Sequence, residues 1–426
     1  MMAHENNIFL STSVQLTEVD VAQLQIGMYV SKLDRPWLNT SFMFQGFELK
    51  NRADIEEVQK QCEFVYIDVE KTKKNVRVVP RKATPFSKNW ILGRNPQKRK
   101  SNFSKEFVYA EVVHKRTSSI VKSFMEDVSI GRAINVEIAK KVVSECVDSV
   151  MKSPDALMWL TQLKNKDEYT SQHSVNVCIL SIALARQINL PENEIQDIGL
   201  CGLMHDMGKM QIPLEILNKP GRFEPEEFDI MKTHPALGMK ILMSSDGMPG
   251  CVIDAVYGHH EQIDGNGYPR GLPAEAIHPY TRIVSIADVY DAISSDRIYK
   301  AGKTHLDTIN ILIQISDKQL DSGLVIKFIE SLGIYPPGNI VELGNGEVAI
   351  VVETNYIQRL KPRITILLDK DKKRIKPRLL DLAKLDLDET DKSYTIKRIV
   401  RADKYGFDLN KLYKMRLVQD SLVTTT

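Results

Sequence analysis

The spacing of hydrophobic residues changes along the chain from a strand pattern to a helix pattern. Residues 14–79 contain short runs typical of strands, at Met28-Tyr29-Val30, in the aromatic-rich segment 42–47 and at Phe64–Val69. From about residue 106 to residue 331 apolar residues recur at three- and four-residue steps, which predicts helices. The clearest helical face consists of Ala139, Val142, Val143, Cys146, Val147 and Val150.

The strand pattern returns after Tyr335-Pro336-Pro337-Gly338. Two apolar runs, Ile340–Leu343 and Val348–Val352, flank Asn345-Gly346, and Ile364–Leu368 follows. Asn-Gly between two apolar runs is a strong signal for a β-hairpin. A small β-rich region is therefore predicted at this end of the chain.

These changes predict a mainly α fold, with a helical bundle between two small β-containing parts. We expect an α+β domain over residues 1–80, a basic linker over 81–105, the helical domain over 106–335 and a β-rich region over 336–426. The linker contains Lys98-Arg99-Lys100, which favours a solvated tether and leaves contact with a phosphate or a membrane surface as the alternative.

The composition argues against polymeric nucleic acid, a disulfide framework and a membrane span. The 57 Lys and Arg residues nearly balance the 55 Asp and Glu residues, so the chain has no bulk charge for binding polymeric nucleic acid. An anionic substrate would have to be met locally. The five cysteines include no CxxC pair, and no apolar run reaches the roughly 20 residues that span a bilayer. We therefore expect a cytoplasmic protein with reduced thiols.

Polar residues that bind metals interrupt several apolar helices. His205-Asp206 follow an apolar run, and Asp288 lies within RIVSIADVYDAI. A buried His beside an Asp is by itself often a hydrogen-bonded core pair. Here, however, His173, His234 and His259-His260 intrude into the same predicted bundle. Together the set offers enough nitrogen and oxygen ligands for two octahedral or nearly octahedral ions.

The motifs HDMGK, HPALG, HHEQIDGNGYPRGLP and ADVYDAISSDRIY resemble those of the HD-GYP family of cyclic dinucleotide phosphodiesterases, a branch of the HD-domain metal phosphohydrolases. The resemblance covers about residues 165–330, and implies that the helical domain is a catalytic bundle of the HD type. The segment GMYVSKLDRPWL resembles a domain of uncharacterised role that often precedes HD-GYP domains.

The resemblance implies two metal sites that share Asp206. One ion would be held by His173, His205, Asp206 and Asp288, and the other by Asp206, His234, His259 and His260. Trinuclear members of the family carry a glutamate four residues before the first histidine, where this chain has Tyr169. The adjacent Glu168 would point about 100° away on a helix, so two ions are expected. Fe or Mn suits such mixed imidazole and carboxylate ligands.

Four further residues are implied to act on the substrate. Lys209 would stabilise the phosphate or protonate the leaving oxygen, and Arg297 and Lys300 would lie near substrate phosphates; a surface salt bridge is the alternative for each. Tyr268, in the Gly267-Tyr268-Pro269 loop, would contact the substrate or a protein partner. The alternative is that this loop is only a tight turn.

The predicted reaction is hydrolysis of cyclic di-GMP or 3′3′-cyclic GMP-AMP to the linear dinucleotide, with a hydroxide between two metal ions as nucleophile. The residues do not choose between these substrates. A catalytically degenerate sensor and an HD phosphohydrolase for ordinary nucleotides are the alternatives. A homodimer is a further hypothesis, because amphipathic helices before His173 could pack between two chains.

Overall fold

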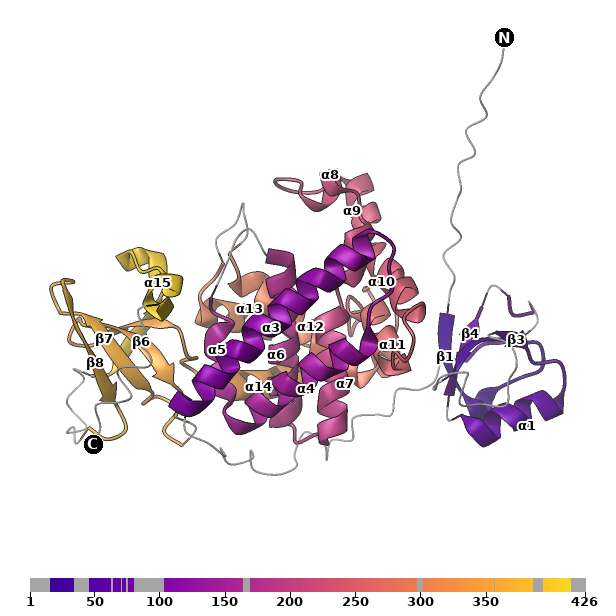
Figure 1. Cartoon of the computed structure of the whole chain (residues 1–426), viewed down its shortest axis with the longest axis horizontal. Coiled ribbons are helices and arrows are strands. Elements are labelled where there is room, and N and C mark those ends of the chain that lie inside the picture. Colours follow the sequence, from indigo (N-terminus) through magenta and orange to yellow (C-terminus); the bar gives the residue numbers. More distant parts are fainter. Residues whose placement is uncertain are drawn as a thin grey trace, which may run out of the picture. The chain divides into compact units, whose positions relative to one another are not determined.

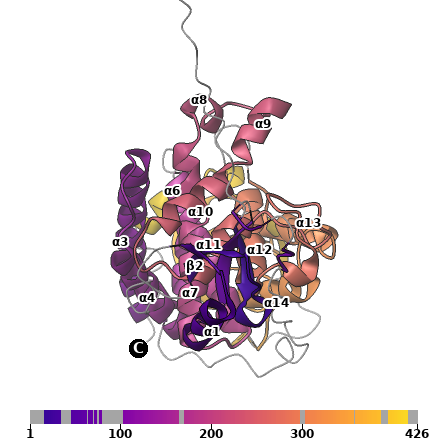
Figure 2. The same cartoon turned by 90° about the vertical axis from the view of Figure 1, so that its right-hand side faces the viewer.

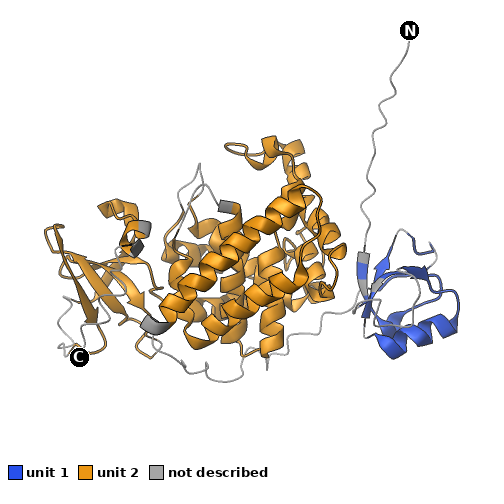
Figure 3. Ribbon diagram, viewed as in Figure 1, with its two compact units in different colours: residues 1–83 blue, residues 84–426 orange. Residues whose placement is uncertain are grey.

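The chain forms two compact units, residues 1–83 and 84–426 (Figure 3). The computed structural model describes residues 16–33, 46–62, 64–69, 71–73, 76–79, 103–163, 169–296, 302–355, 357–385 and 394–414. The predicted strand residues 42–45 and most of the predicted linker, with Lys98-Arg99-Lys100, lie outside these ranges. The predicted domain boundaries stay a prediction.

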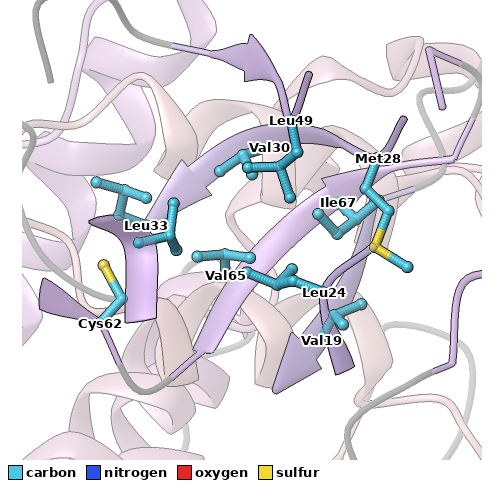
Figure 4. Close-up of a cluster of buried hydrophobic side chains, with 10 residues drawn as sticks. Val19, Leu24, Met28, Val30, Leu33, Leu49, Cys62, Val65 and Ile67 are labelled. Carbon is cyan, nitrogen blue, oxygen red and sulfur yellow. The ribbon is translucent and has the colours of Figure 1, made fainter. Parts of the chain in front are cut away.

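The first unit contains a four-stranded antiparallel sheet in the order β1-β4-β2-β3. Its elements are β1 (Leu16–Asp20), β2 (Tyr29–Leu33), β3 (Phe47–Glu48), α1 (Arg52–Gln61) and β4 (Phe64–Asp68). Alternate residues of the central strands, including Val30, Val65 and Ile67, enter one apolar cluster (Figure 4). Val58 of α1 joins that cluster, so the helix closes one face of the sheet.

The second unit is mostly helical, and the prediction of a mainly α fold is confirmed (Figure 1). The described helices are α3 (Phe103–Ser129), α4 (Val136–Lys152), α5 (Pro154–Leu160), α6 (Tyr169–Gln187), α7 (Glu192–Met204), α8 (Leu214–Leu217), α9 (Pro225–Met231), α10 (His234–Met243), α11 (Gly250–Gly258), α12 (Pro279–Ser294), α13 (His305–Ile315), α14 (Ser322–Leu332) and α15 (Leu409–Lys414), with short 3₁₀ turns that include η4 (Met207–Gln211) and η5 (Ala274–Ala276).

Helix α6 is the central helix of this unit, because α3, α7, α12 and α14 all pack against it. Almost every residue of α6 from His173 onward is buried. The buried face predicted for α4 is confirmed, since the six apolar residues named for that face are all buried. Helices α8 and α9 stand apart from the bundle in both views (Figure 2).

Prolines set many of the helix starts. Pro191, Pro213 and Pro249 lie directly before α7, α8 and α11, and Pro235 occupies the first turn of α10. A proline fits there because the first backbone N–H groups of a helix have no partner within the helix. These prolines therefore coincide with the starts of α7, α8, α10 and α11.

A five-stranded antiparallel sheet follows the helices in the order β8-β7-β6-β5-β9. Its strands are β5 (Ile340–Leu343), β6 (Val348–Glu353), β7 (Arg363–Leu368), β8 (Arg374–Asp381) and β9 (Ile396–Val400). The β5–β6 hairpin turns at Asn345-Gly346, as predicted. Buried Asp155 of α5 accepts hydrogen bonds from the backbone N and Oγ1 of Thr354, which attaches this sheet to the bundle.

Within the described residues, we find no helix with the length and apolar character needed to span a bilayer.

A buried histidine connects three helices on the side of the bundle formed by α12–α14. The hydroxyl of Tyr290 in α12 donates to His305 Nδ1 at 2.9 Å, and His305 Nε2 donates to the Gly333 carbonyl at 3.1 Å. Burial lowers the pKa of His305 to about 4, although the Gly333 carbonyl opposes this shift. The folded protein therefore keeps this ring neutral at neutral pH.

This geometry predicts an acid-sensitive contribution to stability. Between pH 6.5 and pH 4 the unfolded chain binds a proton at His305 that the folded chain does not, so the free energy of unfolding falls as the pH falls. The loss is about 1.4 kcal/mol per pH unit for one histidine. Denaturant unfolding of His305→Asn should show a slope shallower than wild type over this range. An unchanged slope would contradict the assignment.

Candidate metal centre

The seven predicted metal ligands lie together where helix ends meet in the bundle. His205-Asp206 follow the end of α7, His234 begins α10, and His259-His260 follow α11. The remaining two, His173 in α6 and Asp288 in α12, come from within buried helices. Only tertiary packing joins these five segments, because they span 115 residues of sequence.

The ligand atoms form two groups. Those of His173, His205 and Asp206 lie within 4.8 Å of one another, and so do those of His234, His259 and His260. Asp288 belongs with the first group, because its Oδ1 lies 3.0 Å from His173 Nε2 and 3.9 Å from His205 Nε2. We call these groups the first and second clusters.

Asp206 lies between the clusters and turns one carboxylate oxygen to each. Its Oδ2 is 3.2 Å from His205 Nε2 and 3.7 Å from His173 Nε2. Its Oδ1 is 3.5 Å from His234 Nε2 and 3.8 Å from His259 Nε2. A carboxylate in this position can contact two cations at once, which a neutral imidazole with one lone pair cannot do.

Backbone carbonyls fix the orientation of three of the imidazoles. His205, His234 and His259 each use Nδ1 to donate to the carbonyl three residues earlier, at 2.7–2.8 Å. A carbonyl can only accept, so Nδ1 carries the proton and Nε2 of each neutral ring presents its lone pair to the centre. This is the arrangement in which histidines bind metals.

Several lone pairs of the centre face one another or lack a hydrogen-bond partner among the described residues. His234 Nε2 and His259 Nε2 are 3.1 Å apart, so in the neutral rings two lone pairs face each other. Within the described part of the chain, His205 Nε2 and Asp206 Oδ1 are buried without a hydrogen-bond partner. Such groups are costly unless a proton or a metal ion binds them. The donor set thus fits divalent metal ions.

The pKa values of four of the predicted ligands, His234, His259, His260 and Asp206, favour the protonation states that metal binding requires. Burial lowers the pKa of His234 to about 3 and that of His260 to about 4, and holds that of His259 well below its usual range. Burial would raise the pKa of Asp206, but His205 and Lys209 outweigh it and depress that pKa. Three neutral imidazoles therefore face an ionised carboxylate, which is the state needed for ligation.

Two residues that the sequence reasoning missed orient His173. Its Nδ1 donates to Asp291 Oδ2 at 2.7 Å, and Asn176 Nδ2 donates to Asp291 Oδ1 at 2.9 Å. Burial would lower the pKa of His173, but Asp288 and Asp291 outweigh it and raise that pKa to about 9. The available signal was the three-residue spacing of Asp288 and Asp291 on one face of a buried helix.

Lys209 reaches the centre from η4, the 3₁₀ turn that follows Asp206. Its Nζ donates to Asp206 Oδ2 at 2.6 Å, and a quarter of the side chain is exposed. Gly208 brings this turn against α10, since a Cβ at residue 208 would lie 2.0 Å from the His234 carbonyl oxygen. A cationic group that is open to solvent therefore borders the shared carboxylate.

The Gly267-Tyr268-Pro269 loop lies against the second cluster. The Tyr268 ring stacks on His260, with ring centroids 4.7 Å apart and planes inclined by 29°. Tyr268 N donates to the His260 carbonyl at 3.1 Å. The loop is therefore both a turn and a contact with a predicted ligand.

Glu168, Arg297 and Lys300 lie outside the described residues. Tyr169 is the first residue of α6, one turn before His173. The predicted limit of two ions and the predicted phosphate contacts of Arg297 and Lys300 stay predictions.

Three known families match successive parts of the chain. A domain of unknown function, DUF3391, matches residues 16–139, the HD domain matches residues 158–324, and a KOW domain associated with the HD domain matches residues 340–407. The HD match contains every residue of both clusters.

Several known proteins are similar to this chain. The cyclic di-GMP phosphodiesterase PA4108 of Pseudomonas aeruginosa is 36% identical over 356 residues, which cover 82% of this chain and 85% of that protein. The 3′3′-cGAMP-specific phosphodiesterase 1 of Vibrio cholerae is 32% identical over 44% of this chain and 43% of its own length. An HDGYP protein from Bdellovibrio bacteriovorus aligns in structure over 74% of this chain and 98% of its own, with 19% identity and a TM-score of 0.44.

The match to the HD domain, together with a relative that is similar over most of both chains, establishes the family. The chain belongs to the HD-GYP family of HD-domain cyclic dinucleotide phosphodiesterases.

Proposed function

We propose that this protein hydrolyses a cyclic dinucleotide to the linear dinucleotide at a centre of two divalent metal ions. The observation that carries the proposal is the position of Asp206, whose two carboxylate oxygens face two separate histidine clusters. A single-ion site would have no use for a buried carboxylate that is directed both ways.

Each cluster, together with Asp206, contains four residues that can bind a metal ion. In the first, His173, His205 and Asp288 would join Asp206 around one ion, while in the second His234, His259 and His260 would join it around the other. Imidazole and carboxylate ligands suit Fe or Mn. Two such ions, when bound, supply an activated water between them and screen the charge of the phosphodiester.

The chain's own groups would complete the chemistry. Lys209 Nζ lies beside the shared carboxylate, where negative charge accumulates on the phosphate during attack. It can stabilise that charge or protonate the departing ribose oxygen. Asp291 keeps the His173 ring oriented, and the three backbone carbonyls do the same for His205, His234 and His259.

The relatives support the substrate class. The relative that matches 82% of this chain is named for cyclic di-GMP, and another is named for 3′3′-cGAMP. We therefore propose cyclic di-GMP as substrate, with 3′3′-cyclic GMP-AMP as the alternative. The complete ligand set and Lys209 argue against a degenerate sensor. Turnover of both cyclic dinucleotides and of ordinary nucleoside phosphates by anaerobically purified protein tests the choice.

The double variant His205→Ala with Asp206→Ala should lose bound metal and activity while keeping its fold. It removes the shared carboxylate and a nitrogen ligand, and it also removes a buried charge. Metal content by elemental analysis, turnover and circular dichroism are the measurements. His305→Asn is the matched control, because it changes a buried histidine outside both clusters. Full activity of the double variant would disprove the proposal.

Lys209→Met should separate catalysis from metal binding. Nζ contacts Asp206 but belongs to neither cluster, so metal content should stay at the wild-type level. The value of kcat should fall by about 10²–10³, the usual cost of losing a group that stabilises transition-state charge. Loss of metal together with activity would instead make Lys209 a structural residue.

Asp291→Asn should weaken metal binding at the first cluster about 10–100-fold, the usual cost of removing a carboxylate that orients a ligating histidine. The amide retains the size of the side chain but not its charge, so the hydrogen bond from His173 Nδ1 is weakened. Competition with a chelator measures the affinity. Asn176→Ala should have a smaller effect in the same direction, and no effect of Asp291→Asn would leave it a packing residue.

A further inference from the structure

His260 differs from the other four histidines of the centre in what orients its ring. His173, His205, His234 and His259 each donate from Nδ1 to an oxygen at 2.7–2.8 Å. Across the residues that the structure describes, the His260 ring makes no such bond. A ligating histidine almost always has this second contact, because it fixes both tautomer and orientation.

Ring contacts surround His260 instead. It lies against His259, with centroids 4.1 Å apart, and against His234 at 5.0 Å. On another side it meets the nearly parallel ring of Tyr268 at 4.7 Å. Because His234 and His259 are predicted ligands of the same ion, Tyr268 is, among these ring contacts of the described residues, the one from outside the second cluster. The position of Tyr268 thus limits how the His260 ring can turn.

A buried ionic network holds the loop that carries Tyr268. The Arg270 guanidinium donates from Nη1 to Asp254 Oδ1 at 2.8 Å and places Nε 3.7 Å from Glu261 Oε1. It also lies over the Tyr257 ring, 4.9 Å from the centroid. Asp254 and Tyr257 belong to α11, so Arg270 connects the loop to the helix that His259-His260 follow.

Glu261 closes the loop from the other side. Its two carboxylate oxygens accept hydrogen bonds from the backbone N–H of Arg270 at 2.8 Å and of Leu272 at 2.9 Å. The carboxylate is buried and follows His260 directly in the chain. Glu261, the residue after His260, therefore holds the end of the loop at Arg270 and Leu272.

Two glycines allow this close packing. A Cβ at residue 258 would lie 2.8 Å from an Arg270 guanidinium nitrogen, and a Cβ at residue 267 would lie 2.5 Å from Glu261 Cα. Glycine lets one segment lie directly on another at such positions. The loop is therefore seated directly against the residues on both sides of His259-His260.

We propose that Arg270 is a positioning residue for the second metal ion: through the loop it holds Tyr268 against His260 and so keeps the His260 ring directed at that ion. The inference rests on the two-ion centre proposed above. It assigns Tyr268 a role in metal binding that is independent of any contact with substrate.

The alternative is that Arg270 only stabilises the fold, because removing one partner of a buried ion pair leaves the other charge uncompensated. Arg282 provides the matched control. Its side chain is 14% exposed against 11% for Arg270, it pairs with Asp321 at 3.0 Å, and it donates to the Ile277 carbonyl at 3.2 Å. It belongs to the same bundle but to neither cluster.

The experiment compares Arg270→Leu, Arg282→Leu, Tyr268→Ala and Tyr268→Phe in the full-length chain. Mn(II) is titrated into metal-free protein by calorimetry to give the affinity of each ion, and the visible spectrum of Co(II)-loaded protein reports the ligand geometry. Thermal unfolding is measured for every variant. Tyr268→Ala leaves the Arg270 ion pairs in place, so the proposal stays testable if Arg270→Leu does not fold.

Arg270→Leu and Tyr268→Ala should each weaken the second Mn(II) about 10–100-fold and alter the Co(II) spectrum. Tyr268→Phe keeps the ring and should retain the wild-type Mn(II) affinities and Co(II) spectrum. Arg282→Leu should lower thermal stability without changing either Mn(II) affinity. The double variant Arg270→Leu with Tyr268→Ala should lose little more than either single variant, because both act through one contact.

Wild-type affinity of both ions in Arg270→Leu, or losses that add fully in the double variant, would overturn the inference and leave the two-ion centre intact. A wild-type protein that binds only one ion would instead contradict the two-ion centre, and this inference with it.

Discussion

The centre depends on one buried carboxylate. Asp206 is only 1% exposed, and the oxygen that faces the second cluster has no hydrogen-bond partner in the described part of the protein. An ionised carboxylate without compensation would cost several kcal/mol in the interior. Positive charge must therefore gather around it, from Lys209 and from whatever cations the surrounding imidazoles bind. The convergence of five segments on this residue makes sense only as a site built for such charge.

The helix ends fix the ring orientation of three of the histidines. Three ligands sit at the first or last residues of helices or just beyond them, where each imidazole can reach back to the carbonyl three residues earlier. The ring is then fixed by the backbone of its own segment rather than by a distant side chain. His173 lies inside a helix and needs Asp291 from another helix for the same purpose. His260 has neither, and it depends on the loop that follows it.

The Gly267-Tyr268-Pro269 loop is a turn, and it also makes a contact that the sequence did not predict, with the ring of His260. The predicted contact of Tyr268 with substrate or a partner stays a prediction. The loop is a tight turn, held by Glu261 and Arg270, and it is also a contact with the centre through Tyr268. The turn geometry is what makes the contact possible, because Gly267 lets the loop lie directly on Glu261. A motif conspicuous in the sequence thus lies directly against the second cluster, and its aromatic ring contacts His260.

The sequence by itself determined many of the elements and named the candidate ligands. Apolar spacing predicted the buried face of α4, Asn345-Gly346 predicted the β5–β6 hairpin, and polar residues in apolar helices indicated candidate metal ligands. These signals are local, because they arise from periodicity, turn chemistry and the cost of burying charge. The division of these ligands between two ions came from the family resemblance. Tertiary structure alone decided which oxygen of Asp206 faces which cluster and which residues orient the ligands. Asp291 reaches His173 across 118 residues of sequence, and no local pattern specifies such a contact.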